Sequence, residues 1–416
     1  MSSRPPEARR DAAVIGLMGL AHGTSHFFQL LLPPLFPWLM ADFSLSFTQV
    51  GLLMTTFFVI SGVGQALAGF VVDRVGAFRV LLFGVAALAL AALVLSVAGS
   101  YSMLLLTAAL AGSGNSIFHP ADFTILNHRV SQPRLGHAFS MHGLGGNLGW
   151  AAAPVFMAGL ASVAGWHTAA LSASLVAFAV LTVLWLRRRV LIDRPDETAA
   201  AHALHAPSTA PARQFAFLSS GAVWLSFAFF LVTTMAFGIL QNYAPAILSH
   251  VYGVSLVMAN GGLTSYLLGS GAGMIIGGFV AERGEKMVAA ALAFAALMSG
   301  VLASGAMPQL ALWPLMAAMG FGVGTAGPGR DLLVRRAATS RFGRSSFGRV
   351  YGFVYSGLDS GQALSPVLFG PLLDAGHFRQ VLFAVAALQA SGLFFALHVG
   401  SRVQASTPLA APATQP

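Results

Sequence analysis

The sequence has no cysteine and very little charge. The absence of cysteine from its 416 residues excludes disulfides, thiolate metal ligands and a cysteine nucleophile. Only 8% of the residues are Asp, Glu, Lys or Arg, against about 25% in a soluble domain. The chain therefore lacks the polar side chains needed to cover a water-exposed globule of this size. Because 56% of the residues are hydrophobic, a polytopic membrane protein is the class that remains.

Long apolar segments recur along the whole chain. They run without the alternation of polar and apolar residues that marks barrel strands, and therefore predict helices. Pro33, Pro34 and Pro37 interrupt the first segment, where a bilayer tolerates broken backbone only if it faces protein or a cavity. A crossing needs about 20 apolar residues. We therefore expect an all-α membrane protein with twelve transmembrane helices, at 13–39, 48–72, 79–99, 102–126, 137–164, 167–186, 214–248, 255–281, 287–306, 309–334, 347–374 and 378–400.

Basic residues predict how these helices are oriented. With a cytoplasmic N-terminus, 21 of the 22 Lys and Arg residues lie in cytoplasmic segments, and only Arg379 lies outside. A wrong number of spans would reverse every later loop, so this bias supports an even count with both termini in the cytoplasm. The net charge of +9 is thus interpreted as a topology signal and not as a nucleic-acid-binding surface. We expect a multi-pass protein of the inner membrane.

The second half of the sequence repeats short patterns of the first half. The segment 69–74 (GFVVDR) recurs at 278–283 (GFVAER), 209 residues later, and Pro37 recurs as Pro245, 208 residues later. Two further sets repeat at offsets of 208 and 212: Gly112, Gly114 and Pro120 with Gly320, Gly322 and Pro328, and Gly145, Gly149 and Pro154 with Gly357, Gly361 and Pro366. Parallel repeats with a binding site between them are typical of rocking secondary transporters, and no channel filter sequence is present.

The repeats divide the chain into two pseudo-symmetric six-helix bundles, 13–190 and 214–400. Between them, residues 191–213 are rich in Ala, Pro and His, and are typical of a flexible cytoplasmic linker. Residues 1–12 are expected to form a cytoplasmic N-terminal segment. The Pro-, Ala- and Thr-rich residues 401–416 are expected to form a disordered cytoplasmic tail.

Polar side chains inside the predicted helices are functional candidates, because an ionisable group at bilayer depth costs several kcal/mol. His22 and His26 are four residues apart and share a helix face with Gln29. Asp359 lies near the middle of its helix, and Asn147 is the equivalent position of the first half. We expect Asp359 to bind a proton from one side and release it to the other. The predicted solute and proton pathway comprises His22, His26, Gln29, His119, Asp122, Asn147, Asp359 and Gln362.

Other chemistries find less support. The spacing of His22 and His26 suits a metal ion, but no acidic third ligand lies nearby in the sequence, so no metal is predicted. The glycines of 143–149 follow no strand and the chain has no Walker lysine, which excludes ATP binding. No Ser/His/Asp or paired-carboxylate set gathers at one depth, so we expect neither an enzyme nor a cofactor. His142, near the inner end of its helix, is expected to be structural or interfacial.

Two resemblances follow from particular motifs. The pattern Gly69-x-x-x-Asp73-Arg74-x-Gly76-x-x-Arg79 resembles the loop motif of the major facilitator superfamily, with Ala77 where a basic residue is usual. The chain also resembles the fosmidomycin-resistance group of drug exporters. The stretches that carry this second resemblance are His22, His26, Gln29 and Pro37, the corner from Ser44 to Phe47 with Gly51, Phe118-His119-Pro120, and Gly145 to Gly149.

The superfamily resemblance implies a gate on the cytoplasmic side. Asp73 would cap the predicted helix that starts near Phe347, because a carboxylate stabilises the positive N-terminal end of a helix. Glu282, in the second copy of the motif, would do the same near Ala138. Such contacts would hold this side shut and release when the halves rock. The gate residues are Gly69, Asp73, Arg74, Gly76, Arg79, Glu282 and Arg283.

Together these features predict a monomeric transporter in the lipid bilayer that moves a small organic solute by alternating access. Proton coupling is expected from the buried titratable groups, and export of a drug-like or anionic compound is implied by the second resemblance. Two alternatives stay open. A proton-driven importer of an organic acid or siderophore would also use a histidine-rich pathway, and a passive channel would carry flux without competition between solute and proton.

Overall fold

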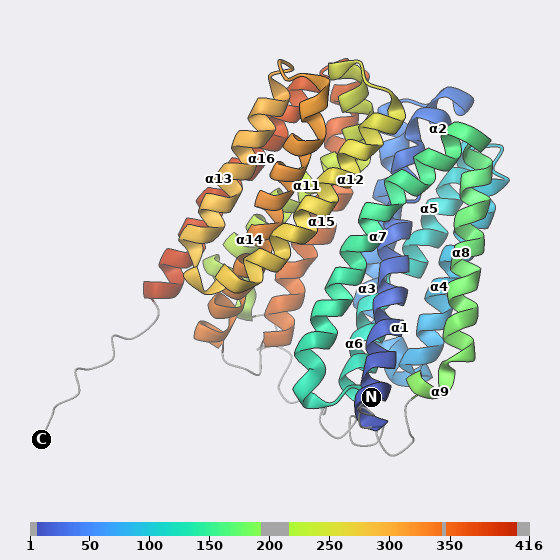
Figure 1. The fold of residues 1–416 in the computed structure, drawn as a ribbon. Coiled ribbons are helices and arrows are strands. Elements are labelled where there is room, and N and C mark those ends of the chain that lie inside the picture. Colours follow the sequence, from blue (N-terminus) through green and yellow to red (C-terminus); the bar gives the residue numbers. More distant parts are fainter. Residues whose placement is uncertain (1–5, 193–215, 343–346, 406–416) are drawn as a thin grey trace, which may run out of the picture.

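The computed structural model describes residues 6–192, 216–342 and 347–405, and every regular element in these ranges is a helix. Two bundles of roughly parallel helices stand side by side, the first half of the chain in blue to green and the second in yellow to red (Figure 1). The start of α1 and the end of α16 lie at the same end of the molecule. We call the opposite end, where α2 lies, the α2 end. The predicted all-α, two-bundle fold is confirmed.

The two bundles use the same order of helices. The first contains α1 (Pro6–Gln29), η1 (Pro33–Leu35), α2 (Phe36–Phe43), α3 (Phe47–Val75), α4 (Ala77–Ser96), α5 (Tyr101–Asn115), α6 (Phe118–Arg129), η2 (Gln132–Arg134), α7 (Leu135–Ala164), α8 (Trp166–Leu186) and α9 (Arg188–Leu191). The second contains η4 (Ala216–Ser219), α11 (Gly221–Tyr252), α12 (Leu256–Val280), η5 (Ala281–Arg283), α13 (Glu285–Ala303), η6 (Gln309–Ala311), α14 (Leu312–Phe342), α15 (Phe347–Asp374) and α16 (Phe378–Ala405). The pairs α1–α7, α3–α5 and α4–α8 correspond to α11–α15, α12–α14 and α13–α16.

Within the described residues, nine helices are long and apolar enough to cross a membrane. They coincide with nine of the twelve predicted spans. The other three predicted spans fall on α1 with η1 and α2, on α5 with α6, and on α15. Polar residues lower the hydropathy of α1 and α15, and a break shortens α5. These three spans hold seven of the eight predicted pathway residues, and the eighth, Asn147, lies on α7.

Prolines cause the breaks in two of these spans. Pro33 and Pro34 follow the end of α1 and form the short helix η1, and both are buried, as irregular backbone inside a bilayer requires. A second break separates α5 from α6. Pro120 explains it, because this residue lacks the N–H group that would bond to the carbonyl of Ser116 in a continuous helix.

Equivalent glycines of the two halves make equivalent contacts. A side chain at Gly149 of α7 would strike the carbonyl oxygen of Gly23 on α1. A side chain at Gly361 of α15 would lie 2.6 Å from the carbonyl oxygen of Leu231 on α11. The pairs Gly145/Gly357 and Gly112/Gly320 behave in the same way. Small residues let helix backbones approach closely, so the sequence repeat is also a repeat of packing.

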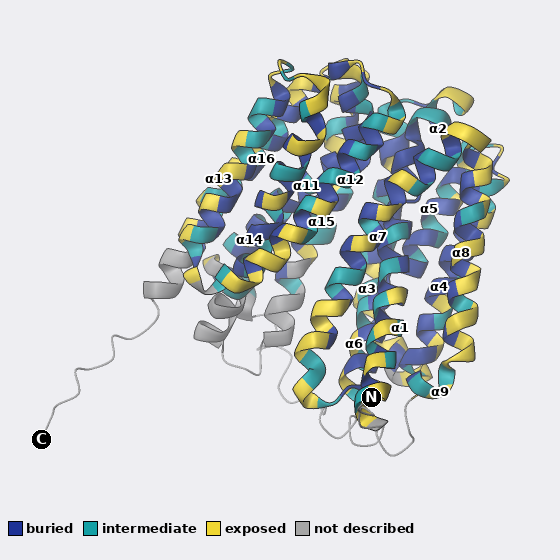
Figure 2. Ribbon diagram, viewed as in Figure 1, coloured by how far each residue is buried: buried dark blue, intermediate teal, exposed yellow. Residues whose placement is uncertain are grey.

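The outer surface of both bundles is apolar. Exposed positions follow the outward faces of the helices, and buried positions lie between them (Figure 2). Phe70, Val163 and Phe279 are 66%, 82% and 85% exposed. Contiguous apolar surface of this kind is rare on soluble monomers but is expected where lipid chains cover the protein. The chain is a multi-pass membrane protein.

The first contact between the bundles runs along α3 and α15. At the α2 end, the Asp374 carboxylate accepts hydrogen bonds from the backbone N–H groups of Phe47 (2.6 Å) and Thr48 (3.0 Å). Farther along, the Thr55 hydroxyl donates to the carbonyl oxygen of Ala363 at 2.9 Å. These bonds join the two halves from the α2 end inward.

Two glycines form the turns that precede equivalent helices of the two halves. Gly76, with φ of 92°, allows the tight turn between α3 and α4, and Gly284, with φ of 74°, allows the turn before α13.

The structure bears differently on the predicted linker and the predicted tail. The linker lies outside the described residues from 193 onward. The predicted disorder from residue 401 is wrong at its start, because α16 continues to Ala405. A formed helix extends at little cost through residues without a breaker.

Candidate functional site

Five titratable side chains gather inside the first bundle, where α1, α6 and α7 meet. We call this set the histidine cluster: His22 and His26 from α1, His119 and Asp122 from α6, and His142 from α7. The side chains of His22, Asp122 and His142 are almost sealed from solvent, with 3%, 0% and 4% of their surface exposed. The structure therefore brings together four predicted site residues and adds His142, which the sequence indicated only as structural.

Asp122 is the centre of the histidine cluster. Its Oδ2 atom lies 3.0 Å from Nε2 of His142 and 3.6 Å from Nδ1 of His22. The rings of His22 and His142 stack with centroids 3.6 Å apart, and the His26 ring lies 4.2 Å from that of His22. Nδ1 of His22 and Oδ1 of Asp122 are buried and have no hydrogen-bond partner within the described part of the chain. Orphaned polar atoms of this kind are rare in native proteins and point to a missing partner.

A chain of contacts leads from the cluster toward the second half. The His26 ring stacks on Trp150 with centroids 4.1 Å apart. The indole N–H of Trp150 donates to Oε1 of Gln29 at 2.9 Å, and Gln29 donates to Oδ1 of Asn115 at 3.1 Å. Trp150 also contacts Phe237 of α11, with ring centroids 5.3 Å apart. Gln29 is therefore linked to the cluster through Trp150.

Asp359 lies apart from the cluster, where α15 of the second half faces α3 of the first. A side chain at Gly62 of α3 would lie 3.4 Å from Cβ of Asp359 and 3.7 Å from its Oδ2. Among the described residues, Asp359 has no hydrogen bond and no ion pair. Burying a carboxylate without a partner costs free energy, so such a residue inside a membrane is a functional candidate.

Asn147 occupies the other seam between the halves, where α7 faces α12. Its Nδ2 donates to the carbonyl oxygen of Gly143 at 3.0 Å and approaches the sulfur of Met274 at 3.5 Å. Nearby, the Thr264 hydroxyl donates to the carbonyl oxygen of Ala151 at 3.0 Å. Asn147 and Asp359 are thus equivalent in the repeat, as predicted, but they face two different seams.

Gln362 lies one helical turn from Asp359 on α15. It is buried, and its Nε2 donates to Oε1 of Gln241 on α11 at 2.8 Å. Among the residues that the structure describes, Oε1 of Gln362 and Nε2 of Gln241 have no hydrogen-bond partner. This amide pair retains one free acceptor and one free donor within the second bundle, a pattern able to bind a polar group.

The predicted gate residues lie at the end of the molecule opposite the α2 end. Arg74, Arg79 and Arg283 are exposed, and a side chain at Gly69 would meet open space. Gly76 supplies the turn described above. The side chains of Asp73 and Glu282 lie outside the described part of the structure, so their capping role stays a prediction.

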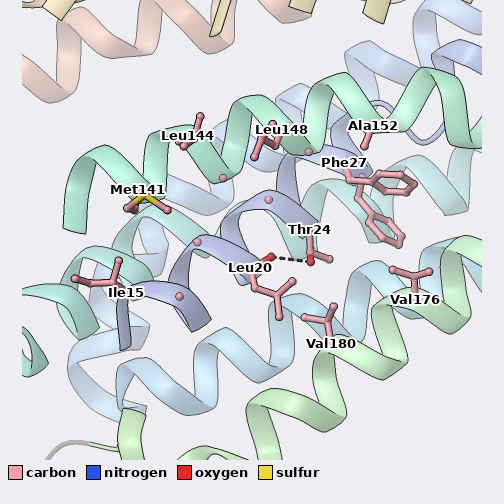
Figure 3. Close-up of a pocket in the computed structure, with 16 residues that line it drawn as sticks. Ile15, Leu20, Thr24, Phe27, Met141, Leu144, Leu148, Ala152, Val176 and Val180 are labelled. Carbon is pink, nitrogen blue, oxygen red and sulfur yellow. Dashed lines mark hydrogen bonds between the residues drawn. The ribbon is translucent and has the colours of Figure 1, made fainter. Parts of the chain in front are cut away.

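A separate groove of about 440 Å³ lies between α1, α7 and α8 (Figure 3). Its lining is apolar apart from Thr24, whose hydroxyl already donates to the carbonyl oxygen of Leu20 at 2.9 Å. Leu148 and Val176 on its walls are 53% and 45% exposed. The groove offers no free polar group to orient a solute, and it opens on the outer face of the bundle. It is therefore not the candidate site.

Sequence reasoning missed the partners that complete the site. His142 was visible as a polar residue in an apolar segment, but its pairing with Asp122 depends on how α6 and α7 pack. Gln65 of α3, which lies 3.1 Å from Nδ1 of His119, and Asn115 of α5 also come from other helices. Their polarity within predicted spans was the one signal in the sequence that could have identified them.

Comparison with known proteins agrees with this architecture. The sequence profile described as Major Facilitator Superfamily matches residues 18–366. The chain is 28% identical to the fosmidomycin resistance protein of Escherichia coli K12 over 290 residues, which are 68% of each protein. It is 25% identical to the probable nitrate/nitrite transporter NarK2 of Mycobacterium tuberculosis H37Rv, over 88% of this chain and 91% of that one.

A solved structure supports the same fold. A bacterial homologue of the human lysosomal transporter Spinster, in an inward-facing and occupied conformation, superposes with a TM-score of 0.73. It covers 99% of this chain and 100% of its own, at 16% identity. The repeat, the paired bundles and the matched profile lead to one conclusion: the chain belongs to the Major Facilitator Superfamily of transporters.

Proposed function

We propose that this protein is a proton-coupled exporter of the inner membrane that moves a small drug-like or anionic solute by alternating access. The observation that carries the proposal is Asp359, an acid at the seam between the two halves that has no partner among the described residues. The protein would act as a monomer, because each chain contains both halves of the pathway. Its termini would lie in the cytoplasm, as the basic residues predict.

Alternating access is supported by how the halves meet. Two similar bundles joined along two seams can rock against each other as rigid bodies. The hydrogen bonds of Asp374 to the start of α3 close the α2 end. With a cytoplasmic N-terminus, that end faces the periplasm, and the structure corresponds to a state closed on the periplasmic side.

Proton coupling is assigned to Asp359. An ionised carboxylate is stable when it faces water but costly when apolar helices enclose it. Asp359 would therefore be neutral when α3 and α15 close around it and ionised when the pathway opens to water. A solute that needs the ionised state and a proton that removes it then compete, which couples the two fluxes.

The solute would contact polar groups on both sides of the seams. Asn147 and Gln362 offer amide groups, and Gln29 lies behind Trp150. His22, His26, His119 and Asp122 would form the wall of the pathway in the first bundle. The resistance named in the relative from Escherichia coli is one that export would provide, which favours outward transport.

Transport by purified protein in liposomes tests this proposal, with fosmidomycin as the probe. We expect fosmidomycin to accumulate when the interior is acidic, because exchange against protons drives it inward in this geometry. Asp359→Asn should abolish accumulation and leave exchange of solute at equal pH. Glu7→Gln, which removes an exposed acid before the predicted first span, should match the wild type.

Three outcomes would count against the proposal. Undiminished accumulation by Asp359→Asn would remove Asp359 from proton coupling. Accumulation only with an acidic exterior would indicate symport and favour the importer of an organic acid or siderophore. Flux that equilibrates without accumulation at any pH gradient would favour a passive channel.

A further inference from the structure

The histidine cluster has the composition and shape of a metal site. Imidazole nitrogen and carboxylate oxygen are the donors that Zn²⁺ and related divalent transition metals bind, whereas Mg²⁺ and Ca²⁺ need six or more oxygen donors. His22, Asp122 and His142 each offer one such donor atom, and the three atoms lie within 4.8 Å of one another. These three side chains alone therefore supply the three protein ligands that a Zn²⁺ site needs.

The distances from Asp122 to the two histidines match a tetrahedral ion. Metal–ligand bonds of about 2.0–2.1 Å place neighbouring donors about 3.3 Å apart in a tetrahedron. Oδ2 of Asp122 lies 3.0 Å from Nε2 of His142 and 3.6 Å from Nδ1 of His22, so the observed separations bracket that value. These separations suit an ion, but the stacked rings of His22 and His142 must turn about their side-chain bonds for both nitrogens to point at it.

Two buried atoms of the triad lack a partner within the described structure, and an ion would supply one to the first of them. Nδ1 of His22 and Oδ1 of Asp122 make no hydrogen bond, although their side chains are 3% and 0% exposed. A simple hydrogen-bonded pair of Asp122 and His142 explains one contact and leaves both of these atoms unsatisfied. A cation at the centre of the triad satisfies the His22 nitrogen and neutralises the carboxylate.

A fourth ligand is already positioned. His22, His26 and His119 form a second group whose donor atoms also lie within 4.8 Å of one another. Gln65 of α3 holds Nδ1 of His119 at 3.1 Å, and a hydrogen bond on one ring nitrogen is how proteins orient the other toward a metal. His119 is therefore the candidate for a fourth ligand, because Gln65 fixes the orientation of its ring.

We propose that His22, Asp122 and His142 bind one resident divalent transition-metal ion of the Zn²⁺ class, with His119 as fourth ligand. The ion ties α1, α6 and α7 together inside the first bundle. It is resident and not cargo, because no side chain of the triad is more than 4% exposed. The absence of a nearby acid in the sequence, which argued against a metal, is overcome because α6 delivers Asp122 to His22.

Zn²⁺ binding to the purified, tag-free protein in detergent tests the site without any measurement of transport. After removal of metal by a chelator, Zn²⁺ is titrated against a chromophoric competitor. We expect the wild type to bind one ion more than Asp122→Asn or His142→Gln, or to bind it at least tenfold more tightly. His250→Gln, which changes an exposed histidine stacked on Phe378 in the other half, should behave like the wild type. Equal Zn²⁺ binding by all four proteins would overturn the proposal.

X-ray absorption of the Zn²⁺-loaded wild type tests the site without a variant, so its result does not depend on whether a variant folds. A first shell of N and O at about 2.0 Å with imidazole scattering beyond it is expected. A shell without imidazole would overturn the site.

Gln65→Ala should weaken Zn²⁺ binding about tenfold or more if His119 is a ligand, and an unchanged affinity would exclude His119. Movement of radioactive Zn²⁺ across liposome membranes would refute a resident ion, and it would leave the exchange of organic solute to its own test.

Discussion

Asp374 of α15 caps the first turn of α3 through Thr48, across the seam between the two bundles. Its Oδ2 atom accepts hydrogen bonds from the backbone N–H of Thr48 at 3.0 Å and from the Thr48 hydroxyl at 2.5 Å. At the C-terminal end of its own helix this negative charge is unfavourable, but at the N-terminal end of α3 it is favourable. The carboxylate is therefore stabilised by the partner bundle, and it favours the state in which the α2 end is closed.

Asp374→Asn should shift the protein toward the state that is open at the α2 end. A charge at a helix N-terminus is worth about 1 kcal/mol, so the ratio of the two states should change roughly fivefold. Because the chain has no cysteine, a single Ala363→Cys on the α3–α15 seam can report the change. Its rate of labelling by a polar thiol reagent added on the side of the α2 end should rise.

Asp42→Asn is the matched control for this experiment. Asp42 lies near the same end and accepts a hydrogen bond from the indole N–H of Trp166 at 2.6 Å, within the first bundle. Its loss removes the same charge without touching the seam, so the labelling rate should not rise. An equal rate in Asp374→Asn and the wild type would show that the cap does not bias the two states.

The close contact between α1 and α7 depends on Gly149. A side chain there would strike the backbone of Gly23, so Gly149→Ala should destabilise the protein by about 1–3 kcal/mol through overpacking. Gly143→Ala, on the same helix with open space around it, should be neutral or slightly stabilising because alanine favours helix. Thermal unfolding in detergent compares the two, and equal unfolding temperatures would contradict the packing argument.

The fold was largely predictable from the sequence. Continuous apolar segments predict the spans, and positive residues in alternate loops predict their orientation. Glycines that recur at a constant offset predict the two similar halves. All three patterns can be seen in the sequence without knowledge of how the helices pack. The structure confirms the repeat at the level of contacts, since Gly149 and Gly361 meet the backbones of equivalent helices. The break before Pro120 was not predicted, because the span 102–126 was expected to be one helix, whereas the structure ends α5 at Asn115 and begins α6 at Phe118.

The site was predictable only in part. Polarity within an apolar helix selected His22 and Asp122 as candidates, and this needs no knowledge of packing. Their separation of 3.6 Å and the presence of His142 beside them depend on how α1, α6 and α7 rotate about their axes. Helix rotation is set by the sum of many weak side-chain contacts, which a single sequence does not display.

The gate motif yields a kinetic prediction. If Asp73 caps a helix of the other half in only one state, Asp73→Asn should slow turnover roughly fivefold, as expected for about 1 kcal/mol, and leave the KM for solute unchanged. Asp73→Glu keeps the charge and should restore most of the rate. Transport rates in liposomes over a range of solute concentration distinguish these effects. A rise in KM at constant maximal rate would place Asp73 in solute binding instead.

Asp11 anchors the start of α1, before the first predicted span, to the segment that joins α6 and α7. The side chain is fully buried, and its Oδ2 accepts hydrogen bonds from Nη1 of Arg134 (2.8 Å) and from the hydroxyl of Ser131 (2.5 Å). Burial alone would raise the pKa of this carboxyl group. The hydrogen bonds from Ser131 and Arg134, with the positive charge of Arg134, outweigh burial and lower the pKa below 3.8.

This lowered pKa fixes how the contribution of Asp11 to stability depends on pH. A carboxyl group whose pKa is depressed by folding stabilises the protein fully above its unfolded-state pKa, near 3.9, and loses that effect as pH falls through the folded-state pKa. Asp11→Asn should therefore lower the free energy of unfolding by roughly 2 kcal/mol at pH 7. The deficit should shrink below about pH 4, whereas Glu7→Gln should show none at either pH. A deficit in Asp11→Asn that persists unchanged at pH 3 in thermal unfolding would mean that packing of the side chain, and not its charge, anchors α1.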